Sequence, residues 1–256
     1  MTVTERISEY LKSRGASCIA VKNAQELSEE VECALVLGGD GTMLQAAGGV
    51  AGKNIPMIGV NLGTLGYLAE IELDNLEEAL EQLIIDDYVC DERIMLQGRI
   101  VGKEEVRDIS PALNDISITR CGSLQIISLK IYVNGLFLCR WNADGIIIST
   151  PTGSTGYNMS AGGPIVEPGA NLILLTPICA HTLNARSIIL KAEDIVEIEI
   201  DSGHNGTVLQ VEANSDGSER ISMETGDKIF ISKAESTTKI IKLSKVSFLE
   251  ILHKKM

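Results

Sequence analysis

The pattern of hydrophobic residues changes near residue 92, and this change limits the folds that the chain can adopt. Up to about residue 90, short apolar runs typical of strands alternate with amphipathic stretches typical of helices. Such alternation indicates a parallel sheet with crossover helices. Beyond residue 92 the segments are mostly β-type and separated by turns, including the hairpin signal Asn134-Gly135. The sequence therefore predicts an α/β domain followed by a mostly antiparallel β domain.

We place the predicted domain boundaries by composition and periodicity. Residues 1–103 form the Rossmann-like α/β domain, 104–234 form the β domain, and 235–256 form a strand and helix that return to the first domain. In the first domain we expect helices over 4–14, 27–32, 43–52 and 73–84, and strands over 17–22, 33–37 and 55–61. We expect a single antiparallel sheet in the β domain, with one apolar face open to water; a two-layer sandwich is the alternative.

Composition and charge exclude several classes of protein. The net charge is −13 over 256 residues, which argues against a nucleic-acid binder or a protein of anionic membranes, because both need a basic face. No apolar run approaches the roughly 20 residues that span a bilayer, and the charged N-terminus does not resemble a signal peptide. The 6 cysteines form no C-x-x-C pair, which favours free thiols in a reducing compartment over a zinc site. We expect a cytoplasmic protein.

Residues 33–52 hold the first segment with recognisable chemistry. The strand at 33–37 runs into GGDGT at 38–42 and then into a helix. Glycines at such a turn let backbone amides approach a phosphate, and the helix N-terminus adds partial positive charge. The loop is neither a Walker A loop nor a dinucleotide G-x-G-x-x-G loop. Asp40 belongs in a phosphate loop only as a general base or a metal ligand; the alternative is an aspartate that satisfies turn amides.

Residues 143–168 hold a second segment, whose neutral polar groups suit a phosphate or a ribose. An apolar strand at 146–148 lies between Asp144-Gly145 and a loop with five hydroxyl residues between 149 and 155. A solvated Ser/Thr/Gly loop is the ordinary alternative. It explains poorly the tyrosine at 157 and the Gly162-Gly163-Pro164 turn close behind it.

These motifs, in this order, resemble those of the NAD kinase family. The matching stretches are GGDGT at 38–42, NLGTLGYL at 61–68, the Asn-Asp pair at 114–115, DGIIISTPTGSTGY at 144–157 and GGPIVEP at 162–168. The resemblance extends from about residue 34 to 190. It implies transfer of a phosphoryl group from ATP or polyphosphate to the 2′-hydroxyl of the adenosine ribose of NAD. It also implies a divalent cation, for which we expect Mg²⁺.

The resemblance implies a role for each matching residue. Asp40 falls on the catalytic base, and Gly38, Gly39, Gly41 and Thr42 fall on the phosphoryl-donor loop. The implied NAD contacts are Asp40, Gly41, Asn114, Asp115, Asn142, Asp144, Thr152, Thr155, Gly156, Tyr157, Asn158, Met159 and Ser160. The family usually has Ala at position 156 and Arg at position 142. We interpret His181 as structural.

Two other functions stay open. A lipid or diacylglycerol-type kinase shares GGDGT and the domain order, but the loop that follows departs from its P-L-G-T-x-N-D pattern. A non-catalytic NAD-sensing module keeps the loops for binding only, and the intact Asp40 argues against it. The family resemblance also implies a homodimer or homotetramer, with the 150–160 loop near a subunit interface. The donor, the preference between NAD and NADH, the metal and the subunit number stay open.

Overall fold

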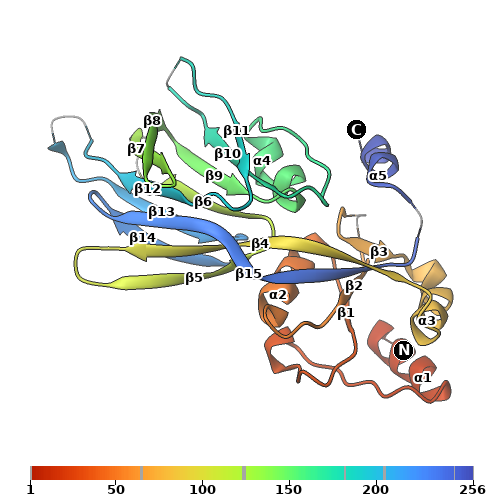
Figure 1. Ribbon diagram of the computed structural model, residues 1–256. Helices are drawn as coiled ribbons and strands as arrows, with labels where there is room; N and C mark the ends of the chain where they lie inside the picture. Colours follow the sequence, from red (N-terminus) through yellow and green to blue (C-terminus); the bar gives the residue numbers. More distant parts are fainter. Residues whose placement is uncertain are drawn as a thin grey trace. The chain divides into compact units, whose positions relative to one another are not determined.

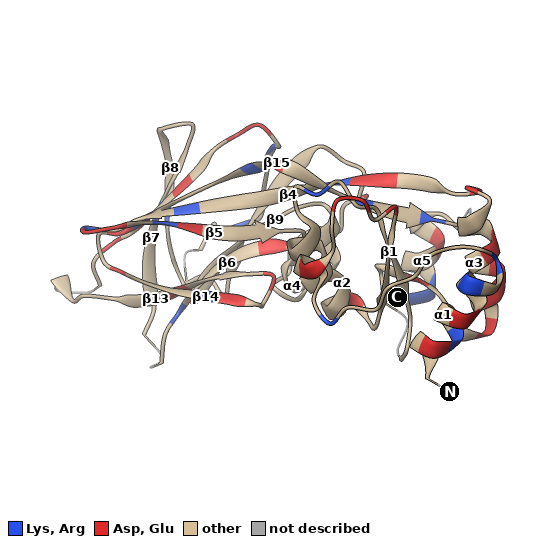
Figure 2. Cartoon of the chain, turned by 90° about the horizontal axis from the view of Figure 1, so that it is seen from below, with Lys and Arg blue, Asp and Glu red and all other residues tan. Residues whose placement is uncertain are grey.

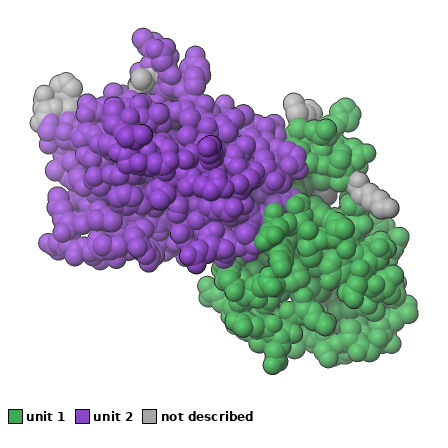
Figure 3. Space-filling model, viewed as in Figure 1, with its two compact units in different colours: residues 1–92, 238–256 green, residues 93–237 purple. Residues whose placement is uncertain are grey.

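The computed structural model describes residues 2–63, 66–122, 125–181, 183–203, 206–244 and 246–255. The chain divides into two compact units (Figure 3): unit 1 contains residues 1–92 and 238–256, and unit 2 contains residues 93–237. These boundaries differ from the predicted 103/104 and 234/235. The first lies earlier because residues 96–101 pair antiparallel with 106–112, which places both strands in the β unit.

Unit 1 is built on short parallel strands (Figure 1). Strand β2 (Met57–Val60) pairs with β1 (Ala34–Leu37), with β3 (Ala69–Ile71) and, through Ile240, with the end of β15 (Lys228–Lys242). The helices are α1 (Val3–Ser13), α2 (Asp40–Val50), α3 (Leu76–Ile84) and α5 (Phe248–Lys255), with 3-10 turns at Ala24–Glu26 and Leu73–Asn75. The predicted α/β domain and the return of the C-terminal segment are confirmed. None of the described helices is long and apolar enough to cross a membrane.

Helices α1 and α3 are held by their apolar faces. Ile7 and Leu11 of α1 and Leu76 and Leu80 of α3 are buried in one core, at the three- and four-residue spacings that put side chains on one helix face. Outside these buried positions both helices carry acidic residues, drawn in red in Figure 2. The amphipathic pattern that predicted these two helices is therefore the pattern that packs them.

Two short predicted elements are wrong. Residues 17–22 form no strand and residues 27–32 form no helix; the regular element in this region is the 3-10 turn Ala24–Glu26. A β-type segment becomes a strand only where a neighbour can pair with its backbone. Within the described part of the chain, β1 is at the edge of its sheet and pairs with β2 alone. Residues 17–22 do not pair with its free edge, so they form no strand.

Unit 2 is a sandwich of two sheets. One sheet has the order β11-β10-β9-β6-β13-β14, and the other contains β15-β12-β7-β8 together with β4 and β5. The strands are β4 (Val89–Val101), β5 (Val106–Ala112), β6 (Asp115–Arg120), β7 (Ile127–Val133), β8 (Leu136–Ala143), β9 (Gly145–Ser149), β10 (Leu172–Ile178), β11 (Ile188–Lys191), β12 (Val196–Ile200), β13 (Gln210–Ser215) and β14 (Glu219–Glu224). A 3-10 turn (Thr152–Thr155) and helix α4 (Tyr157–Ser160) follow β9.

The core of unit 2 corrects the expectation of a single sheet with an open apolar face. Ile118 and Ile148 of one sheet are buried in the same cluster as Leu129 and Ile198 of the other. The alternating apolar residues of each sheet therefore face the other sheet rather than water. Because each sheet covers the apolar face of the other, neither of these faces gives the chain a reason to associate with a second copy.

The predicted Asn-Gly hairpin is confirmed. Asn134 and Gly135 have φ angles of 51° and 77°, the positive values that a type I′ turn requires at both central residues. The turn joins β7 to β8, which pair antiparallel from Ile127 to Val133.

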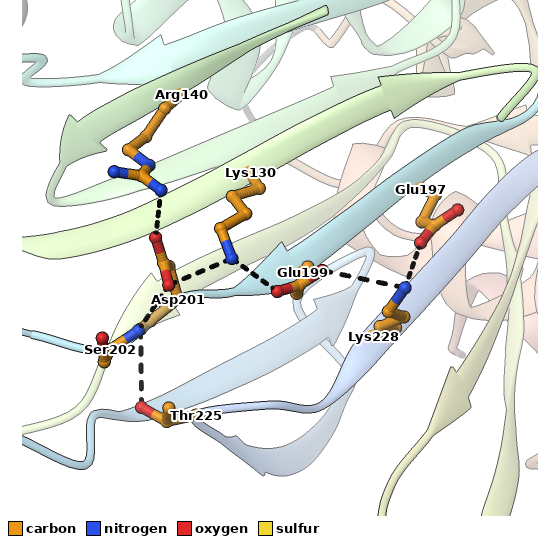
Figure 4. A network of polar contacts seen from close by, with 8 residues as sticks. All are labelled: Lys130, Arg140, Glu197, Glu199, Asp201, Ser202, Thr225 and Lys228. Atoms are coloured by element: carbon orange, nitrogen blue, oxygen red, sulfur yellow. Dashed lines mark hydrogen bonds and ion pairs between the residues drawn. The ribbon is translucent and has the colours of Figure 1, made fainter. Parts of the chain in front are cut away.

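A ladder of alternating charges crosses the face of the sheet opposite this core (Figure 4). Its members, in order, are Arg140, Asp201, Lys130, Glu199, Lys228 and Glu197, with nitrogen–oxygen distances of 2.9, 3.2, 2.8, 3.7 and 2.7 Å. Isolated exposed ion pairs contribute at most about 1 kcal/mol each, and networks more. The ladder keeps this face polar without adding net charge.

Candidate functional site

Strand β1 leads the chain into GGDGT, and helix α2 begins inside the motif. Gly38 donates its N–H to the carbonyl of Val60 at 3.0 Å, and Gly39 is the N-cap of a helix that begins at Asp40 rather than at residue 43. Thr42 lies in the first turn and donates its N–H to the Gly39 carbonyl at 3.0 Å. Over the described residues, the N–H groups of Gly39, Asp40 and Gly41 have no acceptor. Unpaired N–H groups at the start of a helix can donate hydrogen bonds to an anion.

The second motif, NLGTLGYL, folds against the carboxylate of Asp40. The N–H of Tyr67 donates to Oδ2 at 2.7 Å, and the N–H of Leu68 donates to Oδ1 at 2.9 Å. Gly66 permits this approach, because a Cβ at that position would lie 1.9 Å from Oδ1. Each carboxylate oxygen keeps a further lone pair. Asp40 is therefore oriented by the backbone and still able to accept a proton.

In unit 2, Asp216 organises the Asn-Asp pair. Its carboxylate accepts the N–H groups of Leu113 at 2.7 Å, Asn114 at 2.9 Å and Asp115 at 3.0 Å. Asp216 also donates its own N–H to the carbonyl of Asp115 at 3.1 Å. The turn that presents Asn114 and Asp115 is thus tied to the β13–β14 hairpin.

The carboxyl group of Asp115 has an unusual environment. The residue is 7% exposed, and its side chain has no hydrogen-bond partner among the residues that the structure describes. Burial, and then the negative charge of Asp216, raise the pKa of Asp115 to about 7. Burial also raises the pKa of Asp216, but its three N–H donors favour its charged form. Asp216 is therefore better stabilised as a carboxylate than Asp115, and Asp115 takes up a proton more readily than an ordinary aspartate does.

The hydroxyl loop is fastened to the same turn. Thr150 donates its N–H to the Asn114 carbonyl at 2.9 Å and its hydroxyl to the Leu113 carbonyl at 2.6 Å. Gly153 permits close packing, because a Cβ there would lie 2.2 Å from the Asn114 carbonyl oxygen. Gly156 lies beside Asn114, because a Cβ at position 156 would be 3.2 Å from the side-chain amide nitrogen of Asn114. The structure thus brings Asn114 and Asp115 together with Thr152, Thr155 and Gly156.

Asn158 holds this loop through buried hydrogen bonds. It is fully buried, donates to the carbonyls of Ser154 and Pro164 at 3.2 and 3.0 Å, and accepts the Thr176 hydroxyl at 2.6 Å. Both ends of its amide are thus engaged within the protein. Its neighbours Tyr157, Met159 and Ser160 are exposed instead, so their side chains are accessible to a ligand.

Asp144 and Tyr157 belong to the same region of unit 2. Asp144 forms an ion pair with Nε of Arg120 at 3.1 Å. Partial burial, and then the charges of Asp115, Cys179 and Asp144, raise the pKa of Tyr157, which indicates that these side chains are neighbours. Asn142 is exposed, and its carbonyl accepts the N–H of His181 at 2.8 Å.

Two residues of this cluster were not predicted from the sequence. Asp216 stands 101 residues after Asp115 in the chain, and its Asp-Gly pair indicates only a turn. Arg93 is 6% exposed, and its Nη1 donates to the Thr152 hydroxyl at 3.2 Å. A lone arginine in a strand gives no sequence signal of this contact. It supplies a buried positive charge at the hydroxyl loop.

The described side chains contain no group of three His, Cys, Asp or Glu residues suited to hold a metal ion. The six cysteines are free thiols. A divalent cation would therefore have few protein ligands here, which suits Mg²⁺, since this ion commonly takes one or two carboxylates and otherwise substrate phosphates and water.

Comparison with known proteins assigns the family. The family model of the ATP-NAD kinase N-terminal domain matches residues 6–88, and that of the ATP-NAD kinase C-terminal domain matches residues 113–243. NAD kinase of Agathobacter rectalis is 46% identical over 265 residues, with 99% of this chain and 93% of that protein covered. NAD kinase of Lachnospira eligens is 43% identical over 275 residues, with 99% and 94% covered.

Two solved structures share the fold. An NAD kinase from Archaeoglobus fulgidus in complex with ATP is similar with a TM-score of 0.80 and 25% identity, covering 98% of this chain and 93% of that one. Yeast NADH kinase complexed with NADH is similar with a TM-score of 0.78 and 30% identity, covering 87% of this chain and 64% of that one. Together with the two family models and the curated relatives, these matches show that the chain belongs to the NAD kinase family.

Proposed function

We propose that this protein transfers the terminal phosphoryl group of ATP to the 2′-hydroxyl of the adenosine ribose of NAD, with Asp40 as the general base. The observation that carries the role of Asp40 is its pair of backbone hydrogen bonds from Tyr67 and Leu68. They fix the carboxylate while leaving lone pairs for the hydroxyl proton. As the ribose oxygen attacks phosphorus, Asp40 takes that proton, and the bond to the ADP leaving group breaks.

The free N–H groups at the start of α2 are the proposed phosphoryl-donor contacts. Gly38, Gly39, Gly41 and Thr42 surround them, and the helix N-terminus favours the negative charge of the phosphates. The overall net charge of −13 makes such local donors necessary, because the surface as a whole repels a polyanion.

The turn and hydroxyl loop of unit 2 are the proposed NAD contacts. Asn114, Thr155, Gly156, Tyr157, Met159 and Ser160 offer amide, hydroxyl and backbone groups, and Asp115 offers a carboxyl group whose pKa is raised to about 7. Asp144 and Asn142 are proposed contacts from the β8–β9 connection. For Asn158 we propose a supporting role, because its amide is saturated within the protein. Arg93 holds Thr152 in place.

The choice of donor and metal is part of the proposal. ATP is the donor we favour, because the Archaeoglobus fulgidus relative is a complex with ATP; polyphosphate is the other donor to be assayed. Bound Mg²⁺ would neutralise charge on the donor phosphates, and those phosphates and water would be its main ligands, which leaves Asp40 free to act as the base. A lipid kinase is not favoured, since both halves of the chain match NAD kinase models.

We further propose that the enzyme is a homodimer or homotetramer. The family resemblance suggests it, and strand β8 gives a physical reason. It is the last strand of its sheet and exposes Leu136, Phe137 and Leu138 by 75%, 60% and 41%. An edge strand with exposed apolar residues is a site for pairing with another chain.

The reaction is tested with purified protein, NAD, ATP and Mg²⁺, with NADP detected by an NADP-specific dehydrogenase. The variant Asp40→Asn preserves shape, so it should bind NAD while turnover falls by roughly 10²–10⁴, the value of a positioned base. Turnover of Asp40→Asn near that of the unmodified enzyme would reject Asp40 as the base. Absence of NADP from the unmodified enzyme with either donor would reject the function.

A further inference from the structure

The C-terminal part of unit 1 contacts the segment that orients Asp40. Beyond β15, the N–H groups of Leu243 and Ser244 both donate to Oε1 of Glu70, at 2.9 and 2.6 Å. Lys242 forms an ion pair with Oε2 of Glu70 at 3.2 Å, and the Glu70 side chain is only 10% exposed. Hydrogen bonds to a charged acceptor are among the stronger ones in proteins. Glu70 of β3 therefore anchors the chain where it leaves the sheet.

Helix α5 is built as a separate, capped element. Ser247 and Glu250 form a reciprocal capping box: the Glu250 N–H donates to the Ser247 hydroxyl at 3.3 Å, and the Ser247 N–H donates to the Glu250 carboxylate at 2.7 Å. Its partly buried residues are Phe248, Ile251, Leu252 and Lys255, while Leu249, His253 and Lys254 are exposed. The partly buried positions have the i, i+3, i+4, i+7 spacing of one helix face.

That face ends in a contact with the Asp40 segment. The ammonium group of Lys255 lies 4.1 Å from the centroid of the Tyr67 ring, within the range of a cation–π interaction. The backbone N–H of the same Tyr67 donates to Asp40. Residues 66–70 are therefore held by α5 through Tyr67 and by the residues after β15 through Glu70. The two N–H donors to Asp40 belong to Tyr67 itself and to the next residue, Leu68.

We infer that Lys255 is a positioning residue for the kinase reaction: through the Tyr67 ring it holds the Tyr67 and Leu68 N–H groups against the Asp40 carboxylate. The inference rests on the proposed role of Asp40 as the base. It assigns to α5 a function in positioning the catalytic base.

The experiment compares Lys255→Met with Lys254→Met, which removes the same charge from the exposed face of the same helix. Lys255→Met should lower kcat about fivefold, the size that loss of one cation–π contact allows, with KM for NAD unchanged. Amide hydrogen exchange in a peptide covering residues 66–71 should become faster. Lys255→Arg should restore both, because a guanidinium also stacks on a tyrosine ring. Lys254→Met should match the unmodified enzyme.

A second variant tests the other anchor. Glu70→Ala removes the acceptor of the Leu243 and Ser244 N–H groups. Like Lys255→Met, it should lower kcat and make amide hydrogen exchange in residues 66–71 faster. The inference is overturned if Lys255→Met and Lys254→Met show equal kcat and equal exchange, or if Lys255→Met changes KM for NAD alone. The proposed base is judged separately by Asp40→Asn, so Lys255 can fail while Asp40 stands.

Discussion

Asp216 and Asp115 are bound to each other in both directions through the backbone: the Asp115 N–H donates to the Asp216 carboxylate at 3.0 Å, and the Asp216 N–H donates to the Asp115 carbonyl at 3.1 Å. The two carboxyl groups therefore lie close together in a buried place. One result is a turn of fixed shape beside the hydroxyl loop. The other is a carboxyl group, that of Asp115, whose pKa is raised to about 7.

This raised pKa predicts a dependence of stability on pH. The folded protein binds a proton at Asp115 more tightly than the unfolded chain does, so this contribution is complete below the unfolded pKa of 3.8 and is lost as pH rises through about 7. Between pH 5 and 8 the free energy of unfolding should fall by about 3 kcal/mol from this group. Urea unfolding should show that Asp115→Asn, which stays neutral, removes this fall. If the free energy of unfolding fell equally with pH in the unmodified protein and in Asp115→Asn, the predicted contribution of Asp115 would be contradicted.

The role of Asp216 is tested by Asp216→Asn, which removes the charge and one of the two acceptor oxygens. Loss of a charged acceptor from buried N–H groups should cost about 2 kcal/mol of stability and raise KM for NAD severalfold, because the Asn114–Asp115 turn loosens. Asp227→Asn is the control. Asp227 is also buried and accepts one turn N–H, from Glu224 at 2.9 Å, so its loss should lower stability and leave KM unchanged. Equal KM values in the two variants would contradict a site-specific role.

Gly66 should be intolerant of any side chain. A Cβ at Gly66 would collide with the Asp40 carboxylate, whereas Gly63 in the same segment has open space around the corresponding position. Gly66→Ala should therefore lower kcat by about 10²-fold, as displacement of a reacting group by 1 Å can do. Gly63→Ala should remain active. Steady-state kinetics of both variants, with thermal melts to verify folding, check this; an active Gly66→Ala enzyme would show that Asp40 tolerates displacement.

Asp144 is expected to act on NAD and not on the phosphoryl donor. Asp144→Ala should raise KM for NAD roughly tenfold, the value of one charge-assisted hydrogen bond, and leave KM for ATP unchanged. The control is Asp108→Ala, which breaks an ion pair with Arg99 at a strongly exposed position and should change neither constant. Equal effects of Asp144→Ala on both substrates would point to a folding role through Arg120.

The oligomer proposal makes a prediction about strand β8. Light scattering of the unmodified enzyme should give a dimer or tetramer mass, well above the 27.5 kDa of one chain. Replacing Phe137 by Lys should shift the mass toward the monomer, because a charge at the centre of an apolar contact is poorly tolerated. Replacing the exposed Val106, which lies on β5, by Lys is the matched control. A fully active protein at 27.5 kDa would refute the proposal.

The sequence by itself determined the features that depend on a few neighbouring residues. GGDGT between a strand and a helix, the apolar face of α3 and the Asn134-Gly135 hairpin are local patterns, because glycine conformation and helical spacing act within a few residues. Their order along the chain also carried the family resemblance. The local pattern was enough to single out Asp40, whereas Asn114 and Asp115 were singled out through the resemblance.

Only the tertiary structure decided which distant groups meet. Asp216 joins a turn 101 residues earlier, and Glu70 anchors a residue 173 positions later; strand pairing creates these contacts, and no local pattern encodes them. The same holds for residues 17–22, which have strand-like composition but do not pair with the free edge of β1. It holds also for the sandwich of unit 2, because an alternating strand shows that one face is buried and not what buries it.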